Sequence, residues 1–469
     1  MRTPALLITL LALAACAVPA PEKPVAMREQ VPLTLSGVQL DAAPWPTQDW
    51  WQRYDDPVLS QLIRSALDGA PRIATATARI ASAREQVRVA GASQGLQVDL
   101  KAQFERLRLS DNGLLPTDFL GFNWYNQADL GLDIRYQLDW WGRQQAVVDA
   151  ALDRAHAAQA EQRAAMLSLS AAVAQEYFGW QTDDARIALA QQRLQLIDAQ
   201  RQLAARRVTA RLESADYGQQ LELQRATAAE LLVQLQTSQR MRIVALAALV
   251  GTTGEALPAL QAHGLPAVSA GLPESVGIDL LSHRPDIVAS RWRIAAAQRD
   301  TDEVRASYYP DISLHALAGL SSIELGRLLR AGSAAPHLGA ALNLPLFDAG
   351  LRDARHGAAT AALTQAVAEY NTAVVDAARE LGSAAQRVQG AQAQRGAREQ
   401  AQQAASALLG SARARLAGGL THRGPELDAQ IALLSAQDAL LQNDYERVVA
   451  DVQLNQALGG GYIDQETPQ

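Results

Sequence analysis

The chain has 469 residues, of which 48% are hydrophobic, and its 42 basic and 49 acidic side chains give a formal net charge of -7. This mild acidity argues against a nucleic-acid binder, which would carry a basic stripe. The single cysteine, Cys16, excludes an internal disulfide and a CxxC zinc site. The seven histidines form no HExxH motif, so we expect no metal site and no cofactor.

Residues 1–15 have the pattern of a signal peptide: Arg2 is followed by the apolar run Ala5–Ala15, which is too short to span a bilayer. The run ends in Leu13-Ala14-Ala15-Cys16, which resembles the bacterial lipobox. This resemblance implies that Cys16 begins the mature protein and carries diacylglycerol and an N-acyl chain. No Asp follows Cys16, which by resemblance to sorted lipoproteins favours the outer membrane. The alternative is an ordinary cleavage site beside an incidental cysteine.

Residues 16–49 are rich in proline, which predicts an extended tether. Beyond the tether lie two long helical stretches, 142–250 and 350–457. Residues 143–250 contain no proline and only two glycines, Gly179 and Gly218. Ordinary helices run for 8–20 residues, so a pattern of this length indicates a coiled coil or a helical repeat. We expect each stretch to turn once, near residues 207–214 and 416–425.

Four segments alternate between apolar and polar residues, namely 96–106, 128–140, 312–320 and 338–346. Such alternation is typical of strands with one apolar and one polar face. Their lengths suit tilted membrane-spanning strands. The alternative is a half-buried sheet in a soluble protein.

The two halves of the chain repeat each other. Gly142 and Gly350 are separated by 208 residues, as are Val208 and Leu416. We therefore divide the chain into a first repeat, 50–260, and a second repeat, 261–469, each with a helix, two strands and a helical hairpin. A helix of about 66 residues is roughly 100 Å long, so the pattern predicts a tube with strands at one end.

Closure of the sheet then predicts assembly. Lipid tolerates no open sheet edge, and the smallest membrane barrels have about 8 strands. One chain offers four strands, so two chains would give eight and three would give twelve. The polar strand faces would line a water-filled lumen.

Several motifs resemble those of the TolC-like outer membrane efflux proteins, specifically the NodT-type efflux lipoproteins. They are Trp50-Trp51-x-x-Tyr54-x-Asp56-Pro57, Tyr136-x-Leu138-Asp139-x-Trp141-Gly142-Arg143, Arg284-Pro285-Asp286-Ile287, Tyr308-x-Pro310-x-Ile312 and Leu344-Pro345-Leu346-Phe347-Asp348-x-Gly350. The resemblance runs from Trp50 to about Gly459. It implies a mainly α fold, as a homotrimer whose 12-stranded β-barrel continues into a periplasmic tunnel of twelve helices.

The resemblance also implies a function: the exit duct of a tripartite efflux system in the outer-membrane lipid. Its partners would be a periplasmic adaptor and an inner-membrane pump, often of the resistance-nodulation-division class. The alternatives are the outer-membrane channel of type I protein secretion and a structural periplasmic coiled-coil lipoprotein. An enzyme has little support, because the one GxSxG match, Gly91–Gly95, lies between a predicted helix and a strand, whereas a nucleophile elbow needs the reverse order.

Aromatic residues cluster at the strand ends nearest the long helices. They are Trp140, Trp141, Tyr308, Tyr309 and Phe347, and we interpret them as a membrane-interface belt. The loop 107–127 holds Phe119, Phe122, Trp124 and Tyr125, which would form either the opposite belt or an external lid.

The turn of the second hairpin is similar to the family's gate, where an acid at the position of Asp428 forms a constricting ring. Leu416 replaces a frequent tyrosine, and His422-Arg423-Gly424-Pro425 replaces the usual residues before the acid. The remaining candidates for the hydrogen-bond network that closes the gate are Arg206, Arg207, Asp216, Arg413 and Arg415. His422 would add pH sensitivity. The alternative is that Asp428 only pairs with an arginine of an adjacent helix.

Overall fold

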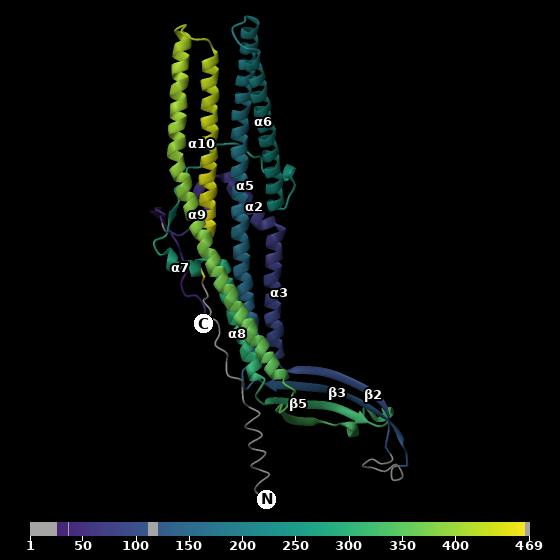
Figure 1. Ribbon diagram of the computed structural model, residues 1–469. Helices are drawn as coiled ribbons and strands as arrows, with labels where there is room; N and C mark the ends of the chain where they lie inside the picture. Colours follow the sequence, from purple (N-terminus) through teal and green to yellow (C-terminus); the bar gives the residue numbers. More distant parts are fainter. Residues whose placement is uncertain (1–25, 36, 111–120, 465–469) are drawn as a thin grey trace.

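The computed structural model describes residues 26–35, 37–110 and 121–464. They form a long helical body with a curved sheet at one end (Figure 1). The α-helices are α2 (Pro57–Gly69), α3 (Pro71–Ser93), α5 (Arg143–Thr209), α6 (Ala215–Val250), α7 (Val276–His283), α8 (Pro285–Ala306), α9 (Leu351–Ala417) and α10 (Gly424–Ala457). The strands are β1 (Asp41–Ala42), β2 (Gln97–Arg108), β3 (Trp124–Leu138), β4 (Gly271–Leu272), β5 (Asp311–Ser322) and β6 (His337–Asn343). None of the described helices combines the length and hydrophobicity that crossing a membrane requires.

The internal duplication is visible in the two longest helices. α5 and α9 each have 67 residues, and both their first and their last residues are 208 positions apart, as predicted. Each helix extends about 100 Å from the sheet to a distant turn. Each follows a glycine in the left-handed conformation, Gly142 or Gly350, and is preceded by an aspartate that accepts hydrogen bonds from its first amides. The same local chemistry therefore starts both helices.

The four long strands form one antiparallel sheet in the order β2-β3-β5-β6. Its register places Val98, Ile134, Ala316 and Leu338 in one row. Because side chains alternate along each strand, this register gathers the apolar residues of all four strands on one face and most polar residues on the other. The strands observed thus combine into the two-faced sheet that the alternation predicts.

The predicted strand bounds are wrong in two ways. Away from the long helices the strands are longer than predicted, since β3 begins at Trp124, β2 ends at Arg108 and β5 ends at Ser322. At the junctions with the long helices, two strands end earlier than predicted. The segment 338–346 extends only to Asn343, because Pro345 has no amide hydrogen to donate to a neighbouring strand. The segment 128–140 ends at Leu138, because Asp139 turns away to accept hydrogen bonds from the amides of Gln144 and Gln145, at 3.1 and 2.8 Å. At both junctions, the residues that precede the long helix therefore end the strand before the alternating pattern stops.

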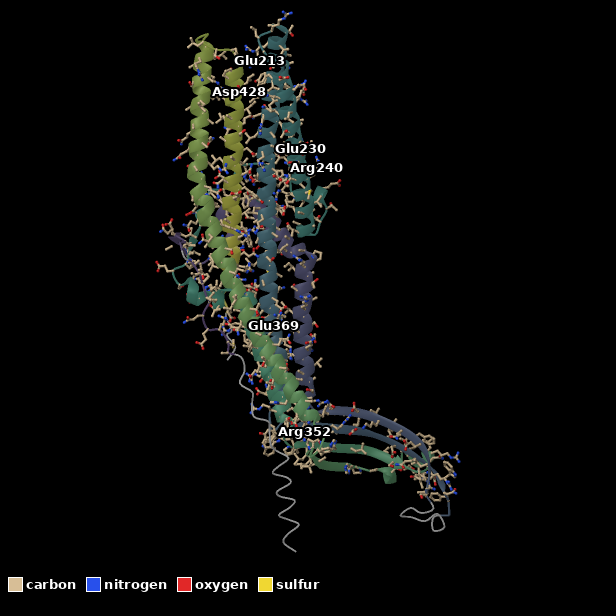
Figure 2. The ribbon with its side chains drawn as sticks, in the orientation of Figure 1. Glu213, Glu230, Arg240, Arg352, Glu369 and Asp428 are labelled. Carbon is tan, nitrogen blue, oxygen red and sulfur yellow. The ribbon has the colours of Figure 1, made fainter. Side chains whose placement is uncertain are left out.

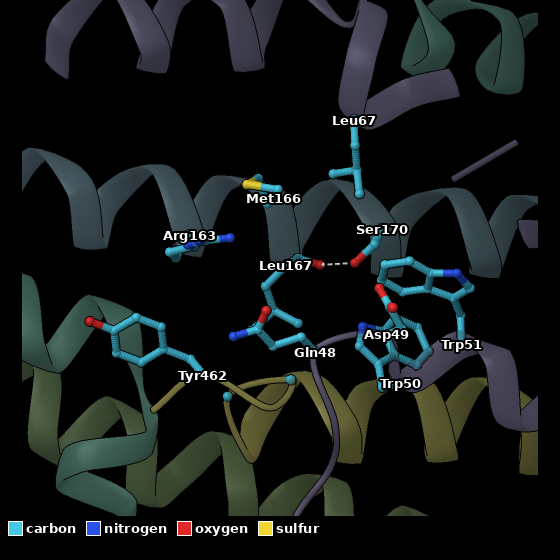
Figure 3. A pocket seen from close by; sticks show the side chains of 12 residues that line it. Gln48, Asp49, Trp50, Trp51, Leu67, Arg163, Met166, Leu167, Ser170 and Tyr462 are labelled. Carbon is cyan, nitrogen blue, oxygen red and sulfur yellow. Dashed lines mark hydrogen bonds between the residues drawn. The ribbon is translucent and has the colours of Figure 1, made fainter. Parts of the chain in front are cut away.

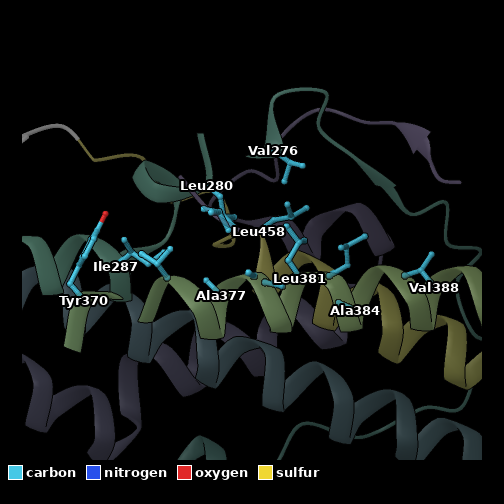
Figure 4. Packing of buried hydrophobic residues seen from close by; sticks show 14 of the residues in the cluster. Val276, Leu280, Ile287, Tyr370, Ala377, Leu381, Ala384, Val388 and Leu458 are labelled. Carbon is cyan, nitrogen blue, oxygen red and sulfur yellow. The ribbon is translucent and has the colours of Figure 1, made fainter. Parts of the chain in front are cut away.

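The helices pack as two hairpins joined along one seam. α5 contacts α6, its hairpin partner, and also α3, α8 and α10, whereas α9 contacts α8 and α10. A buried apolar cluster joins α7, α8, α9 and the end of α10, with Ile287, Leu280, Leu381 and Leu458 at its centre (Figure 4). Burial of such residues stabilises by about 1.5–3 kcal/mol each. This cluster fixes the middle of α9 against the second repeat.

Residues 26–49, which belong to the predicted extended tether, lie along α9. Val31 is buried against the α9 cluster, and Trp45 stacks on His283 with ring centroids 3.9 Å apart. The backbone is bound at two levels of α9: Asn371 contacts Ala26 and Arg28, and Gln389 accepts from the amide of Gln39. We call residues 26–43 the strap. It is extended, as predicted, but it is part of the packed structure.

The opening Trp-Trp motif forms the joint between the repeats. Trp50, Trp51 and Tyr54 are buried in a second apolar cluster with Phe178 of α5. The Tyr54 hydroxyl donates to Asp451 of α10 at 2.6 Å, and Arg53 pairs with the same carboxylate. Trp50 and Trp51 also border a cavity of about 130 Å³ between α5 and the chain after α10 (Figure 3). The burial of these aromatic side chains in the core explains why the motif is present, and no ligand is needed to explain it.

Three consecutive glycines after α10 all have positive φ, namely Gly459, Gly460 and Gly461. A Cβ on Gly459 would lie 1.9 Å from the carbonyl oxygen of His283, and a Cβ on Gly461 would lie 2.1 Å from the carbonyl carbon of Thr47. Backbone atoms cannot move aside cheaply, so these positions require glycine. The C-terminal turn is thereby inserted between α7 and the segment that precedes Trp50.

We predict that Gly459→Ala lowers the unfolding free energy by roughly 2–4 kcal/mol, because it combines an unfavourable φ with a backbone collision. The matched control is Gly410→Ala in α9, where a Cβ meets nothing within 4 Å. This change should stabilise the helix by up to about 1 kcal/mol. Thermal unfolding followed by circular dichroism measures both, and equal melting temperatures for the two variants would contradict the prediction.

Candidate functional site

The polar face of the sheet carries a network of charges. Lys101 of β2 contacts Asp133 of β3, and Arg135 of β3 contacts Asp99 of β2 and lies 3.6 Å from Asp133. Further along, Gln137 donates to Asp311 at 2.9 Å. A face this polar is unsuited to lipid, whereas a water-filled passage would solvate it. The apolar face exposes Val98, Leu100, Phe104 and Leu132. Such a face is suited to lipid and unsuited to water.

The aromatic residues at the helix–strand junction divide into two groups. Trp140 and Phe347 are 70% and 90% exposed, and Trp141 stacks on Tyr309 with ring centroids 4.7 Å apart. These four side chains are placed as an interface belt would need. The assignment of Tyr308 to the belt is wrong: its side chain is buried, and its hydroxyl donates to Asp353 of α9 at 2.8 Å. Tyr308 instead joins the end of α8 to the start of α9.

The loop 107–127 is described only in part. Residues 111–120, which include Phe119, lie outside the described residues. Leu107 and Arg108 belong to β2, while Trp124 and Tyr125 belong to β3. Phe122 and Trp124 are exposed, which is compatible with a belt and with a lid alike.

The far ends of the two hairpins have the same geometry. In the first turn the amide of Leu212 donates to the carbonyl of Arg207 at 2.8 Å, after Arg211 with φ of +59°. In the second the amide of Leu420 donates to Arg415 at 2.9 Å, after Gly419 with φ of +69°. This is a left-handed helix C-cap of the Schellman type. Every residue of one turn corresponds to a residue 208 positions later in the other.

Each turn projects one leucine into solvent. Leu212 is 66% exposed and Leu420 is 80% exposed, and they occupy equivalent positions of the two caps. One exposed apolar side chain is ordinary, but two at matched positions of a repeated turn form a repeated apolar contact point. These two leucines went unnoticed in the sequence, although the 208-residue offset aligns them.

Among the described residues of one protomer, Asp428 has no arginine partner. Its carboxylate accepts a hydrogen bond from Gln200 of α5 at 2.6 Å, which joins the first hairpin to α10 close to the tips. Gln200 is 3% exposed. Tyr217 of α6 lies nearby: burial raises the pKa of its hydroxyl, and the negative charges of Asp428 and Glu213 raise it further against the opposing effect of Arg207. Figure 2 shows Asp428 and Glu213 at this end of the molecule.

Sequence reasoning missed Gln200 and Tyr217. The helix pairing of α5 with α10 brings Gln200 to Asp428, and no pattern in a single sequence reports which long helix neighbours which. Tyr217 directly follows Asp216, a predicted gate residue, and this position in the sequence could have identified it.

The other predicted gate residues are distributed around the tips. Arg207 lies 3.5 Å from Glu213, and Arg413 lies 3.5 Å from Glu426, so each stabilises its own hairpin. Among the residues described, no hydrogen bond or salt bridge partner lies within reach of the side chains of Arg206, Asp216 and Arg415. Leu416 is half-buried. None of these arginines joins the two hairpins.

His422 caps the start of α10, where its Nδ1 accepts a hydrogen bond from the amide of Gly424 at 3.0 Å. Protonation of Nδ1 would remove this acceptor, because a doubly protonated imidazole only donates. The pH sensitivity of the turn stays a prediction.

A second group of charges joins α5 to α6 beside Gln200. Asp198 of α5 accepts from Arg225 of α6 at 2.8 Å and from Arg201 at 3.0 Å. Partial burial opposes ionisation of Asp198, but the hydrogen bonds of Arg225 and Arg201 outweigh it and lower its pKa. Arg186 of α5 binds Asp438 of α10 at 2.7 Å. The seam between α5 and α10 is thus polar at two successive levels.

The described residues contain no cluster of histidine, cysteine and acidic side chains that could hold a metal ion. The GxSxG match is the end of α3 and the turn to β2, with the Ser93 hydroxyl bonded to the carbonyl of Ala90 at 2.6 Å. This geometry is a helix terminus and not a nucleophile elbow, as predicted.

The family model described as "Outer membrane efflux protein" matches residues 62–252 and 278–460, one match for each repeat. The chain belongs to the outer membrane efflux protein family. It is 31% identical to the Escherichia coli K12 multidrug resistance outer membrane protein MdtP, over 92% of this chain and 90% of that protein. The family places the chain in the outer membrane and accounts for the sheet, the paired hairpins and the duplication.

Solved structures agree with this assignment. The outer membrane protein VceC of Vibrio cholerae superposes with a TM-score of 0.79 at 32% identity, covering 89% of this chain and 100% of that one. The Neisseria gonorrhoeae MtrE outer membrane channel, solved in an open state, superposes with a TM-score of 0.79 at 25% identity, covering 96% and 99%. Both cover the sheet and the helical hairpins, so the fold is a TolC-like channel protomer.

Proposed function

We propose that three copies of this chain form the outer-membrane exit duct of a tripartite efflux system. The observation that carries the proposal is the four-stranded sheet with two faces of opposite polarity and two unpaired edges. Among the described strands, β2 pairs only with β3, and β6 only with β5. Lipid cannot satisfy the backbone groups of these edges, so β2 of one copy must pair with β6 of the next. Three copies give a closed barrel of twelve strands.

The helices support the same closure. α6 contacts α5, α2 and the short turn Gly254–Ala256, and its remaining surface exposes Leu223, Val233, Met241 and Val244. On the other side of the protomer, α9 exposes Leu408. Burying these residues between α6 of one copy and α9 of the next would stabilise a ring of helices by the hydrophobic effect. The ring and the barrel then enclose one continuous passage.

The partners follow from the two ends of this duct. At the helix tips, Leu212 and Leu420 would present six equivalent apolar points per trimer, which suits a periplasmic adaptor that repeats sixfold. Such an adaptor would connect the duct to an inner-membrane pump of the resistance-nodulation-division class, which selects the substrate. The protein itself would conduct passively and catalyse no reaction.

Protein secretion through a similar duct is the second candidate. The name of the MdtP relative, a multidrug resistance protein, favours export of small molecules. Deleting the gene and measuring both drug susceptibility and secreted proteins separates the two. Drug sensitivity with an unchanged secretome supports efflux, and the converse supports secretion.

The central experiment measures the assembly and its conductance. We expect the detergent-solubilised complex to have the mass of a trimer and to form ion-conducting pores in planar bilayers, because only a closed barrel satisfies the sheet edges. A stable monomer would contradict the barrel, and a dimer would contradict the count of twelve strands. A trimer without conductance would favour the structural lipoprotein.

The gate is proposed at the helix tips. Three copies of Asp428 around the threefold axis would concentrate negative charge at the narrow end of the duct and attract cations. Within one protomer Asp428 already holds α10 to α5 through Gln200. A carboxylate that both joins the hairpins and faces the passage would couple closure to ion binding.

We predict that Asp428→Asn lowers cation selectivity and weakens block by multivalent cations added on the periplasmic side. Asparagine keeps the hydrogen bond to Gln200 possible but removes the charge. The control is Asp216→Asn, at the other tip, whose carboxylate is exposed and has no salt bridge partner among the described residues. Reversal potentials in salt gradients measure selectivity, and unchanged values for Asp428→Asn would exclude the ring.

Lipidation of Cys16 is a further part of the proposal, and Cys16 itself lies outside the described residues. The strap supports it by its direction and length. Its first residues bind Asn371, which is 20 residues along α9 from the sheet and therefore about 30 Å from it. Ten residues separate Cys16 from Ala26, and they span at most about 35 Å. A lipid on Cys16 can thus reach the inner leaflet beside the barrel.

We predict that Cys16→Ala abolishes labelling with radioactive palmitate while the trimer still inserts. A single lipid anchor contributes only marginal membrane binding, whereas a closed barrel holds the protein in the bilayer by itself. Labelling followed by membrane fractionation tests both parts. Undiminished label on the Cys16→Ala protein would disprove lipidation, and loss of the trimer from the membrane would show that insertion depends on the lipid.

A further inference from the structure

Arg242 of α6 reaches across α5 to α10. Its guanidinium lies over Gly179, the only glycine of α5, where an added Cβ would come within 2.2 Å of an Arg242 nitrogen. On α5 the guanidinium is bound by Asp183 at 2.8 Å and by Glu176 at 3.2 Å. Its carbon lies 5.7 Å from the ring centroid of Tyr445, which belongs to α10. One side chain of α6 therefore contacts two further helices, α5 of its own hairpin and α10 of the other.

Further interactions support this contact. Asp183 is 4% exposed and also accepts a hydrogen bond from Ser238, one helical turn before Arg242, at 2.7 Å. Glu176, Gly179 and Asp183 are spaced at i, i+3 and i+7, so they lie on one face of α5. A glycine inside a helix costs about 1 kcal/mol relative to alanine. The space that the Arg242 side chain occupies beside α5 explains why residue 179 is a glycine.

The second hairpin has no such contact. The positions 208 residues after Arg242, Asp183 and Glu176 are Ala450, Ala391 and Ala384. Gly179 corresponds to Arg387, which donates to Gln453 at 2.6 Å instead. At this level α9 and α10 border a groove of about 490 Å³, lined by Arg387, Gly390, Ala391, Tyr445 and Ala450 among others. The duplication thus kept the helices but placed this contact in one hairpin only.

Arg242, Arg186 and Gln200 mark three levels of one seam. Arg242 meets Tyr445, Arg186 meets Asp438, and Gln200 meets Asp428. The last two pairs show that α5 and α10 run antiparallel. Arg242 is 27 residues along α6 from Ala215, about 40 Å from the tips. At this level α6 also takes part, which ties the whole first hairpin to α10. The level nearest the tips consists of a single hydrogen bond.

We propose that Arg242 is a positioning residue for the closed duct: by crossing α5 at Gly179 to reach Tyr445, it fixes the first hairpin against α10 and keeps the Gln200–Asp428 contact in place at the tips. This inference rests on the proposed function, because it concerns the gate of that duct. It assigns to Gly179, Arg242 and Tyr445 one joint role, which we call the clamp.

The test compares clamp variants with neighbours that lie outside the clamp. Arg242→Gln, Gly179→Ala and Tyr445→Leu each remove or displace one member of the contact. Their controls are Arg240→Gln, an exposed arginine two residues away on α6 (Figure 2), and Gly218→Ala, where a Cβ meets nothing within 4 Å. Only variants with the mass of the wild-type complex are compared.

We expect the three clamp variants to raise the open probability in planar bilayers about tenfold, as for the loss of one charge-assisted hydrogen bond. The two controls should stay at the wild-type value. The double variant Arg242→Gln, Tyr445→Leu should not exceed either single variant, because both belong to one contact. Clamp variants that only lower the melting temperature, with wild-type open probability, would overturn the proposal.

A cross-link tests the connection from clamp to tips. Gln200→Cys with Asp428→Cys, joined by a short bis-maleimide, should restore the low open probability in the Arg242→Gln background. The same reagent on Gln200→Cys alone should not. If the joined tips stay open, the clamp does not act through this seam.

Hydrogen exchange separates failure of the clamp from failure of the proposed function. If the wild-type trimer does not conduct, the exit duct is wrong, yet the clamp still predicts faster exchange of amides 205–216 and 418–428 in Arg242→Gln than in Arg240→Gln. Equal exchange in these two variants would overturn the clamp by itself.

Discussion

A sheet edge in lipid has no water to satisfy its amides and carbonyls, and the architecture follows from this constraint. Each chain supplies four strands with free edges at β2 and β6, so the barrel closes only when copies pair edge to edge. Closure of the barrel sets the spacing of everything attached to it. Because Gly142 and Gly350 start α5 and α9 directly from strand ends, two long helices per chain leave the barrel at fixed positions. The tunnel is thus a continuation of the sheet, and its width is decided in the membrane.

Much of this architecture could be predicted from the sequence. The alternation of apolar and polar residues, with Val98, Leu130 and Leu314 on the apolar faces, and the 208-residue repeat are both visible in a single sequence. The errors have physical causes. Pro345 and Asp139 end their strands early because a proline lacks an amide and a helix needs a cap. Tyr308 resembled a belt residue by position, yet its hydroxyl bonds Asp353, which only the meeting of α8 and α9 brings near. The strap has the composition of a linker, and its contacts with α9 depend on tertiary packing that proline content does not report.

At the candidate gate, local interactions could be predicted from the sequence and long-range ones could not. Asp428 could be singled out from local sequence, but its partner Gln200 could not, because they are 228 residues apart and meet only through the pairing of α5 with α10. Residues that act within one turn, such as His422 on Gly424, are accessible to sequence reasoning. Residues that join hairpins are not. The interactions that hold a closed state lie between elements, and a single sequence reveals elements more readily than their neighbours.

The duplication makes the tips alike and the seams different, and this difference matters for how such a duct can close. Both turns carry the same C-cap and the same exposed leucine, so a trimer presents six similar tips to whatever binds there. Asp428, however, corresponds to Gln220 in the first repeat, and Arg242 corresponds to Ala450 in the second. Docking at the tips, as proposed, would follow a sixfold pattern, while charge and clamping would follow a threefold one. A partner that contacts all six tips equally would meet hairpins of two kinds, one tied to α10 through Arg242 and one with a groove at the equivalent level. The same force on both would move them unequally, so the threefold asymmetry can turn symmetric binding into a change of the passage.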